Sequence, residues 1–484
     1  MIKIRRPRDI KLVLSLIFFV ACLGNTLLEF YTDIAIITKQ IPSSLYFIKL
    51  FLSLPIILIT MGLIQKSLYF YKFGTIINFI ILFFSLSFLS LSIIYLKYEK
   101  SIQKGSLWAV DIFCDGKMKT RGLVGLIPFL YIYSEWVSTL SYLISDLFSS
   151  VMIGFAIYTL ANYCCTEKDM KDIVPYFSSI TAFSMLISVV SIVLKSKYVD
   201  ESTNSRSFNH NSLFYFVLFF LCTVIYLLKT VLPVNEKEVN SKQEIKTDKQ
   251  SHGILDLLKS KFLRNMCTAA LIYAINAGYI DMTFKNALAA GSKMTNMPPK
   301  DYSQKFILTS IITISTVSLI YNFLIRGKFD ANGIFFSSMV SPISAIFFSL
   351  VISFLALYNL NCPVRYTKIN LENWFGAIGY AFSKITKYVL FDMAKEMLSM
   401  RISVEYRYKY KSIYDGICLK LGKSIVSFYC TILTFLGFSD IRRVSHFTLL
   451  FLMAGNFLWI KSVYYLNEKY KKSIDQNTEI DVEN

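Results

Sequence analysis

Residues 384–424 read KITKYVLFDMAKEMLSMRISVEYRYKYKSIYDGICLKLGKS. This stretch sets apolar residues beside charges that a lipid-facing helix would not tolerate, and it ends with Lys423 among apolar residues. Charged side chains inside a membrane are costly and mark a polar path through the bilayer. The stretch therefore predicts a multi-pass membrane carrier, and we expect its solute to be strongly anionic.

Outside this stretch the chain is apolar in long runs. Of its 484 residues, 54% are hydrophobic, and the mean hydropathy is +0.50. Runs of about 20 apolar residues predict membrane-spanning helices, and nothing resembles the alternating strands of a membrane barrel. We expect an all-α integral membrane protein with about twelve transmembrane helices. They are predicted near residues 11–37, 43–64, 72–96, 126–163, 176–196, 212–232, 262–286, 304–325, 332–358, 370–397, 412–437 and 445–467.

A polar stretch divides these predicted spans into two groups. Residues 236–261 are mostly polar and charged, which is typical of a linker. We therefore expect an N-terminal six-helix half at residues 1–235 and a C-terminal six-helix half at residues 262–484, which ends in a short polar tail.

Two weak internal similarities relate the halves. The segment YTDI at residues 31–34 resembles YIDM at 279–282, and YLISD at 142–146 resembles YVLFD at 388–392. The two pairs have nearly the same offset, so they favour two parallel repeats. Such repeats place the solute site between the halves, near the membrane midplane.

The basic character of the chain has a simple explanation in a membrane. Lys and Arg total 51 against 32 for Asp and Glu, a formal net charge of +19. Basic residues gather at membrane edges and at anionic headgroups, so we expect a lipid bilayer and no nucleic acid as partner. The cysteines and histidines lack metal-ligand spacing, so no metal and no cofactor are predicted. Ile417 occupies the place of the first P-loop glycine before Gly422-Lys423-Ser424, which excludes a Walker site.

Four ionisable residues lie well inside predicted spans, where each costs roughly 2.5–3.5 kcal/mol. Two acids and two bases offset one another when the site is empty, and a polyanion can then displace the carboxylates from the lysines. We predict that these residues bind the solute and that the lysine nearest the C-terminus is buried. They are Lys49, Asp146, Asp281 and Lys423.

Structural alternatives exist for each of these residues. Lys49 is close enough to a span end to reach the interface, and Asp281 has Lys285 nearby to balance it. Asp146 and Lys423 lie deeper, where the alternative is a purely structural ion pair. Other charges near span ends are predicted to form gate or interface pairs: Asp33, Asp392, Lys395 and Glu396.

The two charged runs of the opening stretch resemble a known family. LFDMAKEM at residues 390–397 and IYDGICLKLGKS at residues 413–424 are similar to the LFD-x-x-KEM and LGKS runs of the nucleotide transporters, the ATP:ADP antiporters of plastids, chlamydiae, rickettsiae and microsporidia. Weaker similarity covers most of the chain. It includes residues 145–148 and the segment at 280–285.

The resemblance implies a major-facilitator-like fold and import of ATP, in exchange for ADP, by alternating access. The family's two transport lysines and two glutamates map onto Lys49, Lys423, Asp146 and Asp281, with aspartate at both acidic positions. ATP or ADP is then the substrate, and neither an enzyme activity nor an obligate protein partner is expected. The expected location is a parasite cell membrane or the membrane of a mitochondrion-derived organelle, the mitosome.

Three alternatives remain open. The first is a nucleotide/proton symporter, and the second is a carrier of another organic anion such as phosphate, folate or a sugar phosphate; both would have the same fold. The third belongs to a different class and is a multi-pass enzyme or a scaffold that transports nothing. Competition for uptake separates the carriers, and the absence of solute flux identifies a scaffold.

Overall fold

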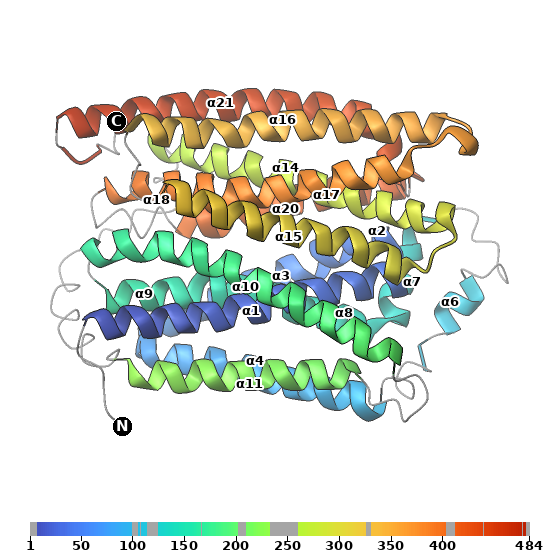
Figure 1. Ribbon diagram of the computed structural model, residues 1–484, viewed down its shortest axis with the longest axis horizontal. Coiled ribbons are helices and arrows are strands. Elements are labelled where there is room, and N and C mark those ends of the chain that lie inside the picture. Colours follow the sequence, from blue (N-terminus) through green and yellow to red (C-terminus); the bar gives the residue numbers. More distant parts are fainter. Residues whose placement is uncertain are drawn as a thin grey trace. The chain divides into compact units, whose positions relative to one another are not determined.

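The architecture was obtained as a computed structural model, shown in Figure 1. Every regular element within the described residues is helical. Of the predicted linker at residues 236–261, only Ser260 and Lys261 belong to the residues that the structure describes. The structure describes residues 7–98, 105–106, 108–113, 124–165, 167–201, 210–232, 260–325, 331–402, 412–438, 440–476 and 478–480.

Contacts divide the chain into two compact units, Met1–Asp248 and Lys249–Asn484. The first unit contains α-helices, π-helical segments (η1, η2, η4) and one 3₁₀ turn (η3). They are α1 (Pro7–Lys39), α2 (Pro42–Phe47), η1 (Ile48–Ser53), α3 (Leu54–Phe70), α4 (Phe73–Ile93), η2 (Ile94–Tyr98), α6 (Trp108–Phe113), η3 (Val124–Leu126), α7 (Ile127–Ser134), α8 (Trp136–Leu147), η4 (Phe148–Ile157), α9 (Tyr158–Cys164), α10 (Glu167–Glu201) and α11 (His210–Val231).

The second unit also combines α-helices with π-helical segments (η7, η8) and 3₁₀ turns (η6, η9). They are α14 (Lys261–Thr295), α15 (Pro299–Ile325), α16 (Ala331–Asn361), η6 (Val364–Tyr366), α17 (Ile369–Ile385), η7 (Thr386–Phe391), α18 (Asp392–Met400), η8 (Ser412–Cys418), α20 (Leu419–Phe435), η9 (Ile441–Val444) and α21 (Ser445–Asp475).

Each predicted span coincides with helical structure. In the described part of the chain, nine helices are long and apolar enough to cross a membrane. Three predicted spans are missing from that set: α14, which holds Asp281, the stretch from α17 to α18, and η8 with α20, which holds Lys423. Their charges lower the hydropathy without preventing the helices. The all-α, membrane-spanning prediction is confirmed.

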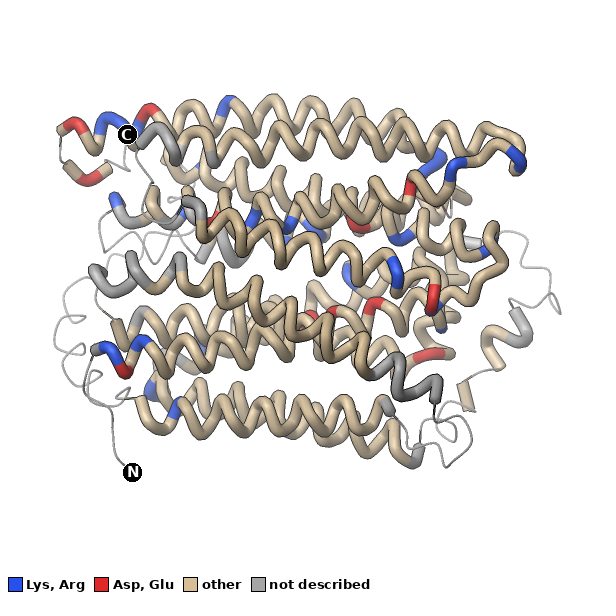
Figure 2. The backbone as a smooth tube through the Cα atoms, in the orientation of Figure 1, with Lys and Arg blue, Asp and Glu red and all other residues tan. Residues whose placement is uncertain are grey.

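The surfaces of the apolar helices suit a lipid environment. Figure 2 shows α11 and α16 without charged residues over most of their described length. Large apolar side chains on α11 are exposed, including Phe220 at 51% and Leu227 at 58%. A patch of this kind is costly in water and is the normal surface of a helix that faces hydrocarbon.

The first unit is built around α1, which packs against α8, α10 and α11. Phe18 of α1 stacks on Phe177 of α10 with ring centroids 4.1 Å apart. Near the other end of α1, the Gln40 side-chain amide donates to Ser138 Oγ at 2.9 Å and to Thr139 Oγ1 at 3.0 Å. These bonds fix α8, which carries Asp146, against the end of α1.

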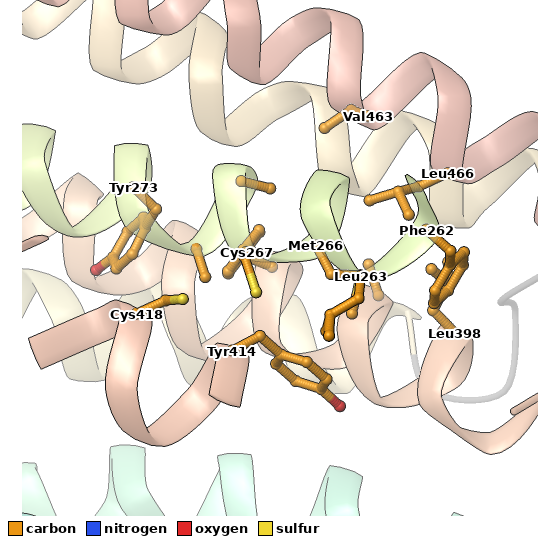
Figure 3. Packing of buried hydrophobic residues seen from close by; sticks show 14 of the residues in the cluster. Phe262, Leu263, Met266, Cys267, Tyr273, Leu398, Tyr414, Cys418, Val463 and Leu466 are labelled. Atoms are coloured by element: carbon orange, nitrogen blue, oxygen red, sulfur yellow. The ribbon is translucent and has the colours of Figure 1, made fainter. Parts of the chain in front are cut away.

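The second unit is built around α14, which packs against α15, α16, α17, α20 and α21. Figure 3 shows its side chains between those of neighbouring elements, with Tyr414 and Cys418 of η8 on one side and Val463 and Leu466 of α21 on the other. Trp459 of α21 is fully buried there. Close packing on several sides fixes the rotation of α14 and so the direction in which Asp281 points.

Candidate functional site

The acid and the base predicted for the first unit lie on elements that pack together. The carboxylate of Asp146, on α8, accepts a hydrogen bond from the Ser53 hydroxyl of η1. Lys49 lies four residues before Ser53, one turn earlier in the same π-helical segment. Both charged side chains are half-buried. The fold therefore brings Asp146 to within one helical turn of Lys49.

The π-helical geometry around Lys49 has a local cause in the sequence. Pro55 is the second residue of α3, which begins directly after η1. Proline has no N–H to donate to the preceding turn, so the regular hydrogen-bond ladder is interrupted there. Widened turns are common at functional sites. Sequence patterns in hydropathy do not reveal them.

Asp281 is paired within its own helix. Lys285 Nζ lies 3.1 Å from Asp281 Oδ1, with side-chain exposures of 8% and 14%. The two residues are one turn apart, with the acid nearer the N-terminus, which is the favourable order. This is the structural alternative that the sequence left open for Asp281. A role for Asp281 in solute binding stays a prediction.

The expectation that Lys423 is buried is wrong, because its side chain is exposed. The neighbouring residue occupies the buried position instead. A Cβ at Gly422 would lie 2.6 Å from Ala274 Cβ and 2.6 Å from the Leu271 carbonyl oxygen of α14. Only glycine allows this approach, and Lys423 lies about 100° further round the helix.

The exposed Lys423 does not share the apolar face of α20. Leu421, Ile425, Phe428 and Ile432 are all exposed and form an apolar stripe along the helix. At about 100° per residue, Lys423 lies about 140–180° from each of them. Ser427, one turn later on the same side of the helix, is buried and donates its hydroxyl to the Lys423 carbonyl at 3.1 Å. The lysine therefore points away from the side that suits lipid.

The residues predicted as gate or interface pairs have mixed surroundings. Asp392 and Lys395 form an ion pair on α18, with 2.9 Å between Oδ1 and Nζ. Asp33 is buried in α1 at 8% exposure. Glu396 lies in α18, and its side chain is outside the described part. The proposed gating role of these residues stays a prediction.

A buried ionic network in the second unit was not predicted. Arg442 Nη1 lies 3.1 Å from Glu372 Oε1, and Arg442 Nη2 lies 2.7 Å from Asp440 Oδ2. Asn359 Nδ2 donates to Glu372 Oε2 at 2.7 Å. Glu372 and Arg442 fall at or beyond the ends of predicted spans, where a charge is expected to be solvated. The sequence carries no signal that two such ends meet.

Metal chemistry has no support from the described residues. Among them, no group of three or more His, Cys, Asp or Glu side chains is placed so that it could hold a metal ion. The polar groups that the fold brings together are carboxylates, ammonium groups and hydroxyls.

Long apolar helices, some interrupted by partly accessible charges at mid-span, define a multi-pass integral membrane transporter. The family follows from comparison with known proteins. The model of the TLC ATP/ADP transporter family matches residues 8–470, so the chain belongs to that family. The resemblance found in the sequence is thereby confirmed.

Relatives and solved structures agree with this assignment. The chain is 28% identical over 497 residues to ADP,ATP carrier protein 4 of Encephalitozoon cuniculi, covering 98% of this chain and 91% of the relative. It is 26% identical over 317 residues to ADP,ATP carrier protein 1 of Chlamydia trachomatis, covering 62% of this chain and 59% of the relative. A bacterial homologue of the iron transporter ferroportin, in an inward-facing state, aligns with a TM-score of 0.52 at 12% identity, covering 95% of this chain and 100% of that one. This likeness concerns the fold alone, and it confirms the expected major-facilitator-like architecture.

Proposed function

We propose that this protein exchanges ATP for ADP across a parasite membrane by alternating access. The observation that carries the proposal is the family match over residues 8–470. Relatives from microsporidia, Chlamydia and Rickettsia are named ADP,ATP carrier proteins. The nucleotide is bound, carried and released without chemical change.

In this proposal, Lys49 and Lys423 bind the phosphate groups. Both side chains are at least partly accessible, so a solute reaches them without unfolding a helix. Lys423 lies across α20 from the apolar stripe, which is the orientation that a lysine in a water-filled path requires. Phosphate oxygens are strong acceptors for ammonium groups, and each such bond is charge-assisted.

Asp146 and Asp281 keep the empty site neutral. Asp146 is oriented by the Ser53 hydroxyl, one turn from Lys49, so it balances that lysine until phosphate displaces it. Asp281 is already balanced by Lys285 at 3.1 Å. A nucleotide that draws Lys285 away would expose the charge of Asp281. The acids therefore bias the resting state, and the lysines make the contacts with substrate.

Lys423→Gln is the direct test of this site. It removes a charge-assisted hydrogen bond, and uptake of labelled ATP by cells expressing the chain should fall at least about tenfold. Lys472→Gln is the control, because Lys472 is 63% exposed and pairs with Glu468 near the end of α21. Membrane abundance is measured for both. Undiminished uptake by the Lys423→Gln protein at normal abundance would exclude Lys423 from the site.

Competition and localisation complete the test. Unlabelled ATP and ADP should suppress uptake, whereas phosphate, folate and sugar phosphates should not. Immunoelectron microscopy should place the protein in the parasite cell membrane rather than in the mitosome. Strong competition by phosphate alone would favour a different organic-anion carrier.

A further inference from the structure

A small cavity lies inside the C-terminal unit, where side chains of α14, α16, α17, η7 and α21 meet. It offers about 10 Å³ to the centre of a water molecule, which is the room that one water molecule needs. Trp459 of α21 forms part of its wall and is 0% exposed. The cavity is thus large enough for one solvent molecule and far too small for a nucleotide.

This cavity and α20 lie on different faces of α14. Tyr273 and Ile280 of α14 line the cavity. Gly278 instead faces α20, since a Cβ there would lie 3.3 Å from Val426 Cγ2. At about 100° per residue, Gly278 lies about 140–160° round α14 from the two cavity residues. The cavity is therefore separate from the site proposed at Lys423.

The wall carries hydroxyl groups whose protons are already donated within the protein. Ser344 Oγ donates to the Ser341 carbonyl at 2.9 Å, and Ser341 Oγ donates to the Thr386 carbonyl at 3.4 Å. Thr386 Oγ1 in turn donates to the Ser383 carbonyl at 3.2 Å. All four residues line the cavity. A hydroxyl oxygen that has donated its proton keeps lone pairs, so this side of the wall offers acceptors to a further donor.

The indole N–H of Trp459 is the complementary group. Its Nε1 is buried and has no hydrogen-bond partner among the described residues. Because an unpaired buried donor is costly, a partner is expected. One water molecule accepts from this N–H and donates to hydroxyl oxygens of the wall, as buried waters do. A cation fits less well, because the described residues of the wall include no carboxylate to balance it.

Aromatic rings offer the Trp459 N–H a weaker alternative. The rings of Tyr273 and Phe391 meet the indole edge-to-face, with centroids 6.0 and 5.9 Å away. An N–H that rests on a ring face gains less than one that donates to an oxygen. The water therefore satisfies the indole better than either ring does.

Two helices depart from regular α geometry at the cavity. Pro342 lies inside α16, between the wall residues Ser341 and Ser344, and it cannot donate to the preceding turn. Thr386 begins the π-helical segment η7 directly after α17. Irregular turns of this kind are places where water inserts beside a helix backbone. The cavity thus combines the room, the polar groups and the backbone geometry of a water site.

We infer that this cavity binds one water molecule, which accepts from the Trp459 N–H and donates to hydroxyl oxygens of α16 and of the stretch formed by α17 and η7. The water joins α21 to these helices at their irregular turns. The site belongs to the fold of the C-terminal unit, so the inference goes beyond the proposed transport and does not depend on the solute.

Radiolytic labelling tests for this water in the wild-type protein. Brief X-ray irradiation of the detergent-solubilised chain forms hydroxyl radicals from bound water, and mass spectrometry detects the side chains that they oxidise. Phe348, in the cavity wall and 7% exposed, should be oxidised several times faster than Phe214. Phe214 is the control, since it is 9% exposed and packs against two aromatic rings. Equal oxidation of the two residues would overturn the inference.

Trp459→Phe tests the proposed donor, because it keeps an aromatic ring and removes the N–H. Loss of one hydrogen bond should weaken water binding about fivefold, so oxidation of Phe348 should fall toward that of Phe214. Trp374→Phe is the matched control, since Trp374 is 38% exposed on α17, and it should leave Phe348 unchanged. If Trp459→Phe is not stably inserted, Ser344→Ala removes an acceptor instead and should have the same effect. Unchanged oxidation of Phe348 in a normally abundant variant would overturn the inference.

Discussion

Breaking the buried ionic network at Arg442 should destabilise the C-terminal unit strongly. Arg442→Met removes the guanidinium that lies 3.1 Å from Glu372 and 2.7 Å from Asp440. The Glu372 side chain is 0% exposed, so its carboxylate keeps Asn359 at 2.7 Å but loses its cation. A buried charge left without its partner costs about 3–5 kcal/mol. Asp440 is 24% exposed and is partly rescued by solvent.

The assay uses the chain's own thiols. Cys267, Cys418 and Cys430 are buried free cysteines of this unit, so a thiol-reactive dye reports their exposure as the detergent-solubilised protein is heated. Arg442→Met should unfold at a clearly lower temperature. The double variant Glu372→Gln with Arg442→Met removes the orphaned charge and should recover part of the loss.

The control breaks an exposed pair of the same kind. Lys472→Met removes the 2.7 Å contact with Glu468, whose side chain is 65% exposed, and no measurable change is expected because solvent replaces the partner. If Arg442→Met unfolds at the same temperature as Lys472→Met, the network does not stabilise the unit and the reasoning is refuted.

Two further predictions concern helix contacts in the same unit. Gly422→Ala places a Cβ 2.6 Å from both Ala274 Cβ and the Leu271 carbonyl oxygen, and this overpacking should lower the free energy of unfolding by about 1–3 kcal/mol. The control is Gly62→Ala, where a Cβ has nothing within 4 Å and should be neutral or stabilising. Equal effects of the two variants would contradict the close approach at Gly422. Asn276→Ala leaves Asn456 without the paired amide bonds of 3.0 and 3.1 Å and should cost about 0.6–1.7 kcal/mol. A wild-type unfolding temperature for Asn276→Ala would show that the pair contributes nothing.

Much of the fold follows from the sequence because membrane helices are set by local composition. Runs of Ile, Leu and Phe locate the spans, since a helix that crosses hydrocarbon must satisfy its own backbone. Several helices extend well beyond the predicted bounds, as α14 does to Thr295. The break at Glu135, between α7 and α8 (φ −105°, ψ 43°), divides the predicted span at 126–163. The hydropathy of this predicted span does not reveal where the break falls.

The site was harder to predict, because the position of a residue along a membrane span does not say on which side of the helix its side chain lies. Lys423 was expected to be buried from its position within a span, and it is exposed. A signal was present: Leu421, Ile425, Phe428 and Ile432 recur at helical spacing and mark the apolar face, which puts Lys423 opposite. The Glu372–Arg442 pair had no such signal, since 70 residues separate its partners and only tertiary packing brings them together.

Nucleotide exchange itself is tested most directly with purified protein in lipid vesicles. Labelled ATP uptake is measured into vesicles loaded with ADP and into empty vesicles, with the Lys423→Gln protein as control. The account predicts that internal ADP stimulates uptake strongly, that the internal label is recovered as ATP, and that Lys423→Gln abolishes the stimulation. Uptake that is independent of internal ADP, or that is driven only by a proton gradient, would contradict exchange.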